Sequence, residues 1–372
     1  MLRFEVLQAQ EGDCFIMRWT DGDDMRVAVI DGGPRASDGQ QHPYKNLVRR
    51  LDELKGDAQS LTLDWVMVSH IDDDHINGLL KLMTTLRNAS DSGDPLPYDV
   101  RRFWFNAFED IADARPAEAA QVAGAVASLG QDIVGGLSHR TDAVLASIGQ
   151  GRNLRDALDT FGLGDNQPVG GLVKSGVPLA DIDGLKVTVV GPLETQLKAL
   201  REDWKTQKPR TAQEAAYADK SVANLSSIVC HVAYQVSQGK WRTILLTGDA
   251  RGDYLLEGLK AANLLKGDRL KVDLMKVQHH GSDRNVEKAF FERVLAKHYV
   301  ISANGKHDNP DKETLKWLIE ARGNGAYTLH ISNKLDWMEG FFQAQKTGGR
   351  KFKVVYRGEP EDDDSIDEIK LA

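Results

Sequence analysis

Hydrophobic and polar positions alternate along much of the chain in a way that predicts β-strands. Residues 2–8 alternate apolar and polar, which is the period of a half-buried strand. The run Trp65–Val68 is short and wholly apolar, as in a strand buried on both faces. A Gln-Gly turn at 238–239 predicts a hairpin. Further strands are predicted at 14–19, 25–30, 100–105, 185–190, 227–236, 242–246, 274–277, 298–301, 327–332 and 351–356.

Apolar positions spaced three and four residues apart predict amphipathic helices. The segment 44–54 carries leucines on one face and Arg49 and Arg50 on the other, so we expect both arginines to be solvated. A second helix is predicted directly after the strand Trp65–Val68, because isoleucine and leucine recur there at helical spacing. A third helix is predicted at 312–321.

The composition shifts between residues 109 and 180. Alanine and glycine dominate and strand patterns vanish, while helical patterns appear at 116–129 and 143–161. We therefore expect a helical insertion within a single domain that spans residues 1–358. Residues 147–154 of the insertion have two interpretations, a contact to substrate or a packing element between helices.

Two further segments stand out by their charge. Residues 194–220 are rich in lysine, arginine and glutamine, and are the best candidate for a local basic contact surface. Residues 359–372 form an acidic C-terminal tail that we expect to be solvated. The formal net charge of −8 argues against a broad basic face that binds nucleic acid non-specifically.

The overall composition is that of an ordinary globular protein. Hydrophobic residues make up 41% and charged residues 27% of the 372 positions. No basic leader precedes an apolar core, and no run of 18 apolar residues occurs, so we predict neither a signal peptide nor a membrane span. Cys14 and Cys230 both lie in strand-like stretches, which favours buried thiols in a reducing compartment. We therefore expect a cytoplasmic protein.

The candidate chemistry begins between the strand Trp65–Val68 and the helix that follows it. Four potential metal ligands occur within six residues, namely His70, Asp72, Asp74 and His75. Alternating imidazole nitrogens and carboxylate oxygens suit a pair of divalent cations, with the first two residues on one ion and the last two on the other. The alternative is a solvated acidic turn that caps the helix, but a cap needs one aspartate and no histidine.

Three later strand ends add further candidates. Asp249 ends the sequence Leu-Leu-Thr-Gly-Asp, His279 and His280 open the sequence His-His-Gly-Ser, and His307 follows the strand 298–301. Each is a weak signal by itself, since an aspartate after glycine is most often a turn former. Motifs for a competing serine nucleophile, for a P-loop and for a dinucleotide-binding loop do not occur in the sequence.

In their order and form, these motifs resemble those of ComEC-type hydrolases of the metallo-β-lactamase fold. The pattern His-x-Asp-x-Asp-His matches, with Asp72 where most members of the wider fold carry a second histidine. The turn around Gly12-Asp13 and the Asp-Gly-Gly turn at Asp31 are similar to the opening of that family. The resemblance implies an αββα sandwich, in which two mixed sheets lie face to face, helices cover the outside, and the active site lies at the sheet ends.

The resemblance also implies roles for the candidate residues. Asp249 would bridge two divalent cations and the hydroxide between them. His70 and Asp72 would hold one ion, and Asp74, His75 and one of His279 or His280 the other; His280 is favoured as the ligand, and His279 as a contact to phosphate. Asp31 would orient the ligand histidines. The remaining candidates are Asp74 and His307 as catalytic residues, and Ser282, Asn304 and His307 as substrate contacts. An additional histidine that many relatives place on the first ion has no equivalent here.

The resulting hypothesis is a hydrolase that depends on two divalent ions, zinc or manganese, and cleaves phosphodiester bonds with a bridging hydroxide. Its substrate would be a nucleic acid or nucleotide, and the acidic charge favours a short or single-stranded one. One alternative is hydrolysis of another ester, such as a thioester, lactone or phosphocholine ester. The other is a metal-binding regulatory or defence module with weak or no turnover. Protein partners stay unknown.

Overall fold

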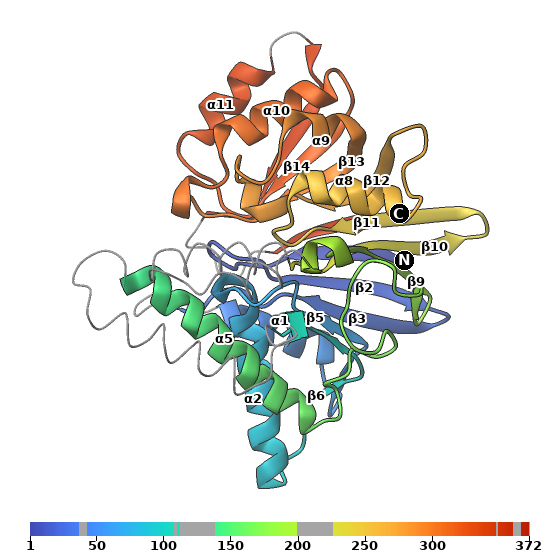
Figure 1. The fold of residues 1–372 in the computed structure, drawn as a ribbon, viewed down its shortest axis with the longest axis vertical. Helices are drawn as coiled ribbons and strands as arrows, with labels where there is room; N and C mark the ends of the chain where they lie inside the picture. Colours follow the sequence, from blue (N-terminus) through green and yellow to red (C-terminus); the bar gives the residue numbers. More distant parts are fainter. Residues whose placement is uncertain are drawn as a thin grey trace.

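Two β-sheets lie face to face, and helices cover both outer faces (Figure 1). This computed structural model describes residues 1–36, 43–107, 110–111, 138–198, 226–346, 349–359 and 366–371. The two facing sheets and their outer helices confirm the αββα sandwich predicted from the sequence.

The first sheet has six strands in the order β16-β1-β2-β3-β5-β7. Its strands are β1 (Leu2–Val6), β2 (Phe15–Asp21), β3 (Asp24–Ile30), β5 (Trp65–Met67), β7 (Phe103–Trp104) and β16 (Asp367–Leu371). Neighbours from β16 to β3 run antiparallel, whereas β3, β5 and β7 run parallel. A separate small sheet pairs β4 (Leu61–Leu63) with β6 (Tyr98–Val100).

The second sheet has eight strands in the order β15-β14-β13-β12-β11-β10-β9-β8. They are β8 (Ala180–Ile182), β9 (Leu185–Gly191), β10 (Val229–Ser237), β11 (Lys240–Leu246), β12 (Leu270–Lys276), β13 (Val294–Ile301), β14 (Tyr327–Ile331) and β15 (Phe352–Tyr356). The predicted hairpin joins β10 to β11, and the strands from β11 to β15 run parallel. Because their carboxyl ends share one edge, polar residues that follow these strands are brought together.

Helices from the two halves of the chain cover opposite sheets. The first sheet is covered by α1 (Pro43–Lys55), α2 (Asp73–Ser92) and α5 (Ser138–Asp159). The second is covered by α8 (Gly252–Ala261), α9 (Lys288–Arg293), α10 (Lys312–Arg322) and α11 (Met338–Gln345). Between the sheets lies a third apolar core, to which Trp19 and Trp65 contribute from one side and Val187 and Leu246 from the other.

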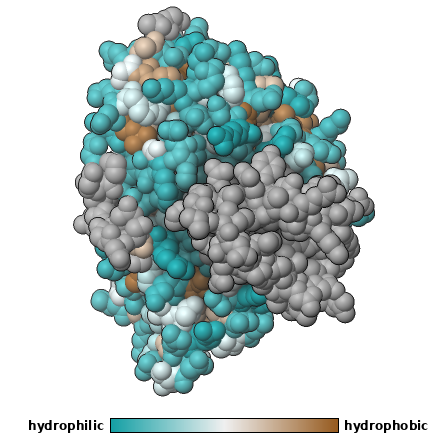
Figure 2. Space-filling model, turned by 60° about the vertical axis from the view of Figure 1, so that its left-hand side comes forward, coloured by the Kyte–Doolittle hydropathy of each residue, from teal (hydrophilic) through white to brown (hydrophobic). Residues whose placement is uncertain are grey.

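The surface seen in Figure 2 is mostly hydrophilic where the structure describes it, and apolar residues emerge in small separate areas. None of the described helices combines the length and the apolar character that a membrane crossing needs.

The insertion and the basic segment are described only in part. The predicted helix at 143–161 corresponds to the later part of α5, which ends at Asp159, but the one at 116–129 falls outside the described residues. Of the basic segment 194–220, only the first residues, to 198, are described.

The predicted solvated tail is wrong for its last residues, because Asp367–Leu371 form strand β16, which pairs antiparallel with β1. The charged residues Glu368 and Lys370 alternate there with Ile369 and Leu371, and both of these apolar side chains are buried between the sheets. On the other face, Glu368 binds Arg3 and Arg18. A period of two within an acidic run is therefore a strand signal.

The expectation that Arg50 is solvated is also wrong. Glu5 is fully buried, and it accepts hydrogen bonds from Arg18 Nε at 2.6 Å and from Arg50 Nε at 2.8 Å. A buried carboxylate needs such partners to offset its lost hydration. This network fastens α1 to the first sheet, whereas Arg49 pairs at the surface with Glu53.

The Glu5→Ala variant is expected to lose about 3 kcal/mol of the free energy of unfolding, because two arginines then lose their buried partner. Glu53→Ala removes an exposed partner of Arg49 and Arg50 and should cost at most about 1 kcal/mol. Urea denaturation of both variants and of wild type measures the difference. Equal stability of the two variants would contradict the assigned role of Glu5.

Candidate metal centre

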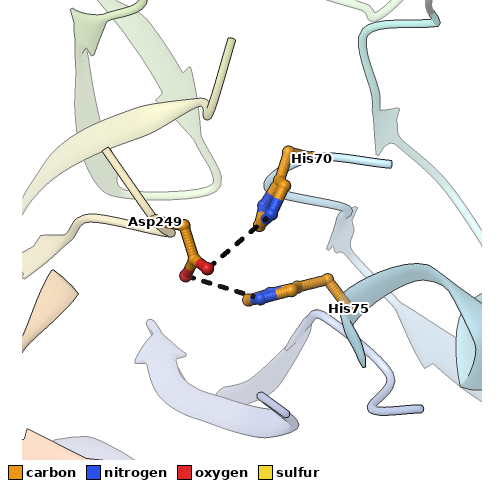
Figure 3. Close-up of side chains that lie close together, drawn as sticks. All are labelled: His70, His75 and Asp249. Carbon is orange, nitrogen blue, oxygen red and sulfur yellow. Dashed lines mark ion pairs between the residues drawn. The ribbon is translucent and has the colours of Figure 1, made fainter. Parts of the chain in front are cut away.

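The candidate ligands meet where strands of both sheets end. His70 follows β5 and His75 lies in the first turn of α2, so both come from the first sheet. Asp249 follows β11 of the second sheet, and the three side chains point toward one another across the gap between the sheets (Figure 3). Residues far apart in the chain therefore form one cluster.

Asp249 lies at the middle of this cluster. Its Oδ2 atom is 3.9 Å from Nε2 of His70, 3.6 Å from Nε2 of His279 and 3.5 Å from Nε2 of His280. Its Oδ1 atom is 3.4 Å from Nε2 of His75. The two carboxylate oxygens thus face different histidines.

Asp74 completes a second group of ligand atoms. Its Oδ2 is 3.1 Å from Nε2 of His280, and its Oδ1 is 3.8 Å from Nε2 of His75. The two histidine Nε2 atoms are 3.3 Å apart. Ligands bound to one ion at about 2.0–2.2 Å are separated by roughly these distances. The groups His70–His75–Asp249 and Asp74–His75–His280 can therefore each hold a metal ion.

Hydrogen bonds behind the rings decide which nitrogen faces the centre. Asp31 accepts hydrogen bonds from Nδ1 of His75 at 3.0 Å and from Oγ of Ser69 at 2.8 Å. The Ser69 hydroxyl proton is thereby used, so its oxygen accepts from Nδ1 of His70 at 3.1 Å. The Nε2 lone pairs of both histidines then point into the cluster. Asp31 thus contacts both Ser69 and the ring of His75, and its role in orienting the ligand histidines stays a prediction.

The surroundings of these lone pairs show whether a metal ion fits the cluster. Nε2 of His70 is buried and, within the described parts of the chain, has no hydrogen-bond partner. Its neighbours are carboxylate oxygens, Asp72 Oδ2 at 3.7 Å and Asp249 Oδ2 at 3.9 Å. A lone pair that faces other acceptors is unfavourable unless a cation lies between them. Nitrogen and oxygen donors of this kind fit a divalent cation such as Zn²⁺ or Mn²⁺.

Electrostatics in the metal-free centre lead to the same conclusion. Burial by itself lowers the pKa of His280, but the charges of Asp249 and Asp13 outweigh it and raise the pKa to about 10. The pKa of His75 is likewise raised well above its usual value, against burial, by Asp249, Asp74 and Asp31. Without metal these rings hold protons where a cation would bind, so metal binding releases protons.

The turn after β12 aims two consecutive histidines at the centre. It forms a short 3₁₀ helix, Gln278–Gly281, in which His279 and His280 have positive φ angles of 47° and 54°. Nδ1 of His280 donates to the carbonyl of Ser302 at 2.9 Å, which leaves its Nε2 for the cluster. His279 is the more exposed of the two, with 21% of its side chain accessible.

Close backbone contacts hold the ligand loop in place. A Cβ atom on Gly78 would lie 2.0 Å from the carbonyl oxygen of Gly32, and one on Gly12 would lie 1.9 Å from that of Asp74. Only glycine permits such approaches. The Asn-Gly pair in α2 and the Gly-Asp turn before β2 therefore fix the position of Asp74.

The insertion helix α5 also supports this loop. Gln150 is buried and donates hydrogen bonds to Asp73 Oδ1 at 2.8 Å and to Asn77 Oδ1 at 3.2 Å. Asp73 lies inside the ligand motif. Of the two interpretations of residues 147–154, this contact supports the packing element.

Sequence reasoning missed two residues of the cluster. Lys276 is buried, and its Nζ lies 2.6 Å from Asp13 Oδ2 and 3.3 Å from Asp249 Oδ1. Asp13 in turn lies 3.5 Å from Nδ1 of His280. The available signal for Lys276 was a lysine within the apolar strand just before the His-His pair.

Asn304 and Ser282, two of the predicted substrate contacts, make side-chain hydrogen bonds to residues outside the cluster. Asn304 donates to Gln10 Oε1 at 3.3 Å, and Ser282 Oγ accepts from the amide of Arg284 at 3.4 Å. His307 is exposed on the turn Lys306–Asp308. Their contact with a substrate stays a prediction.

Comparison with known proteins adds little to this geometry. No family model and no curated protein sequence matches the chain. Among solved structures, the metallo-beta-lactamase fold protein YhfI from Bacillus subtilis is similar over 99% of this chain and 100% of that chain, with a TM-score of 0.40 and 10% identity. At that level of similarity we interpret the site from its own residues, which define an αββα protein with a candidate metal centre.

The Asp31→Ala variant is expected to bind Mn²⁺ or Zn²⁺ about 10- to 100-fold more weakly than wild type, because His75 and Ser69 lose the acceptor that orients them. Competition with a chromogenic chelator measures the dissociation constant, and circular dichroism verifies that the variant is folded. Asp23→Ala, at an exposed hairpin, is the control. An unchanged affinity in a folded Asp31→Ala variant would contradict the role of Asp31.

Proposed function

We propose that this protein is a hydrolase that uses two divalent cations, Zn²⁺ or Mn²⁺, to cleave phosphodiester bonds. The observation that carries the proposal is the position of Asp249, whose two oxygens face different histidines at 3.4 to 3.9 Å. A carboxylate in that position would help to hold two divalent cations, and such pairs supply charge stabilisation for displacement at phosphorus.

The proposed ligands divide into two sets around the bridging residue. His70 and Asp72 hold one ion, and Asp74, His75 and His280 hold the other. The two cations, when bound, stabilise the charge on the attacking and leaving oxygens and lower the pKa of water toward about 7. The ligand histidines His70, His75 and His280 are buried, whereas the side chains of Asp72 and Asp74 are 22% and 29% exposed. Substrate therefore approaches from the aspartate side.

His279 is suited to contact the phosphate. Its Nε2 lies next to Asp249, and it is more exposed than His280. Burial lowers its pKa, and this outweighs the opposing effect of Asp249, so the ring is neutral at pH 7 and has a hydrogen-bond donor to offer. His307, on the turn after β13, is proposed to protonate the leaving oxygen.

The substrate class follows from charge and from the donor set. A phosphodiester carries a negative charge. The cations and imidazoles of the centre would stabilise this charge in the ground state and in the transition state. The net charge of −8 disfavours long duplexes, so a short or single-stranded polynucleotide, or a cyclic dinucleotide, is the proposed substrate.

Wild-type protein loaded with Mn²⁺ is expected to hydrolyse single-stranded DNA, RNA or cyclic dinucleotides, and chelation should abolish the activity. Asp74→Ala should lower turnover by at least about 100-fold, because the second ion loses a ligand. Asp91→Ala, an exposed position on the same helix, is the matched control and should keep wild-type activity. Metal content per chain is measured in parallel.

The outcomes separate the alternatives. Turnover of thioester, lactone or phosphocholine substrates without phosphodiester cleavage would show that the protein is a hydrolase of another ester class. Bound metal with no turnover of any substrate would favour a regulatory module. Failure of wild-type protein to bind metal would refute the metal centre itself.

A further inference from the structure

The cluster contains a lysine, Lys276, and its side chain is almost completely buried. Lys276 is 1% exposed, although lysine is almost never fully buried unless its charge is paired. Its Nζ donates hydrogen bonds to the carbonyl of Gly248 at 2.9 Å and to Asp249 Oδ1 at 3.3 Å, and it forms an ion pair with Asp13 Oδ2 at 2.6 Å. The ammonium is therefore fully coordinated by oxygen, as a bound cation would be.

The same oxygens belong to a potential metal site. Asp13, Asp249 and His280 each offer a ligand atom within 4.8 Å of the others. Nζ of Lys276 contacts both of these carboxylates. The ammonium thus lies against two of the three members of this group.

The charge balance indicates why a fixed cation is needed there. Asp13 is 1% exposed and lies behind the histidines, where its nearest ring nitrogens are Nδ1 of His280 at 3.5 Å and Nδ1 of His75 at 3.7 Å. Lys276 lies nearer to Asp13 than either ring does, with Nζ 2.6 Å from Oδ2. With Lys276 in place, the carboxylates are compensated in the metal-free protein.

We propose that the ammonium of Lys276 is a built-in cation that closes a third cation position, between Asp13 and Asp249, and thereby sets how many metal ions the centre holds. Lys276 is then a positioning residue. It holds Oδ1 of Asp249 and directs Oδ2 toward His70, His279 and His280. The inference rests on the proposed metal centre, but it is independent of the phosphodiester substrate.

The test is the metal content and thermal stability of Lys276→Ala, which removes the charge and leaves room for a hydrated ion. Equilibrium dialysis against Mn²⁺ followed by elemental analysis is expected to find one more ion per chain than in wild type. The metal-free variant should melt at a lower temperature than metal-free wild type. Addition of Mn²⁺ should raise the melting temperature of the variant by more than it raises that of wild type. Both readouts are independent of catalysis.

The double variant Asp13→Asn/Lys276→Ala is the matched control, because it also removes the carboxylate of the third position. It should lose the additional ion and regain stability without metal. If Lys276→Ala does not fold, Lys276→Gln, which keeps a neutral hydrogen-bond donor, is measured in the same way. A variant that binds the same number of ions as wild type, or fewer, overturns the proposal. Failure of wild-type protein to bind any ion refutes the centre instead.

Discussion

The structure depends on how it compensates charge buried between its two sheets. The carboxylate of Asp249 is buried, and so are the imidazoles around it, whose Nε2 lone pairs face carboxylate oxygens. Acceptors that face acceptors in a region of low dielectric repel each other, so protons or metal ions must lie between them. Lys276 supplies one permanent positive charge, and the remaining positions suit divalent cations.

The surrounding fold holds these groups against their mutual repulsion. Asp31 and Ser302 bind the histidine rings from behind, so each ring is fixed in orientation as well as in tautomer. The glycine contacts bring the backbone of the ligand loop against neighbouring loops, and Gln150 of the insertion holds the loop from the side. A centre supported in this way is largely organised before any ion binds, which reduces the entropy lost on binding.

Local patterns were sufficient to predict most strands and the helices that follow them. The pattern failed at the C-terminus, where acidic residues concealed the alternation of β16, and at Arg50, whose partner Glu5 is 45 positions earlier in the chain. Both failures share a cause: the deciding contact is long-range, and a sequence window contains only one side of it.

For the site, the sequence by itself determined which residue types are available and at which strand ends they lie. The motif from His70 to His75 and the pair His279-His280 were recognisable because their ligands are close in sequence. Only the tertiary structure decided that Asp249 stands between them, that Asp31 lies behind the rings, and that Asp13 and Lys276 belong to the cluster. A lone aspartate or lysine carries only a weak local signal, because its role is set by the charges that packing of the two sheets brings within 4 Å of it.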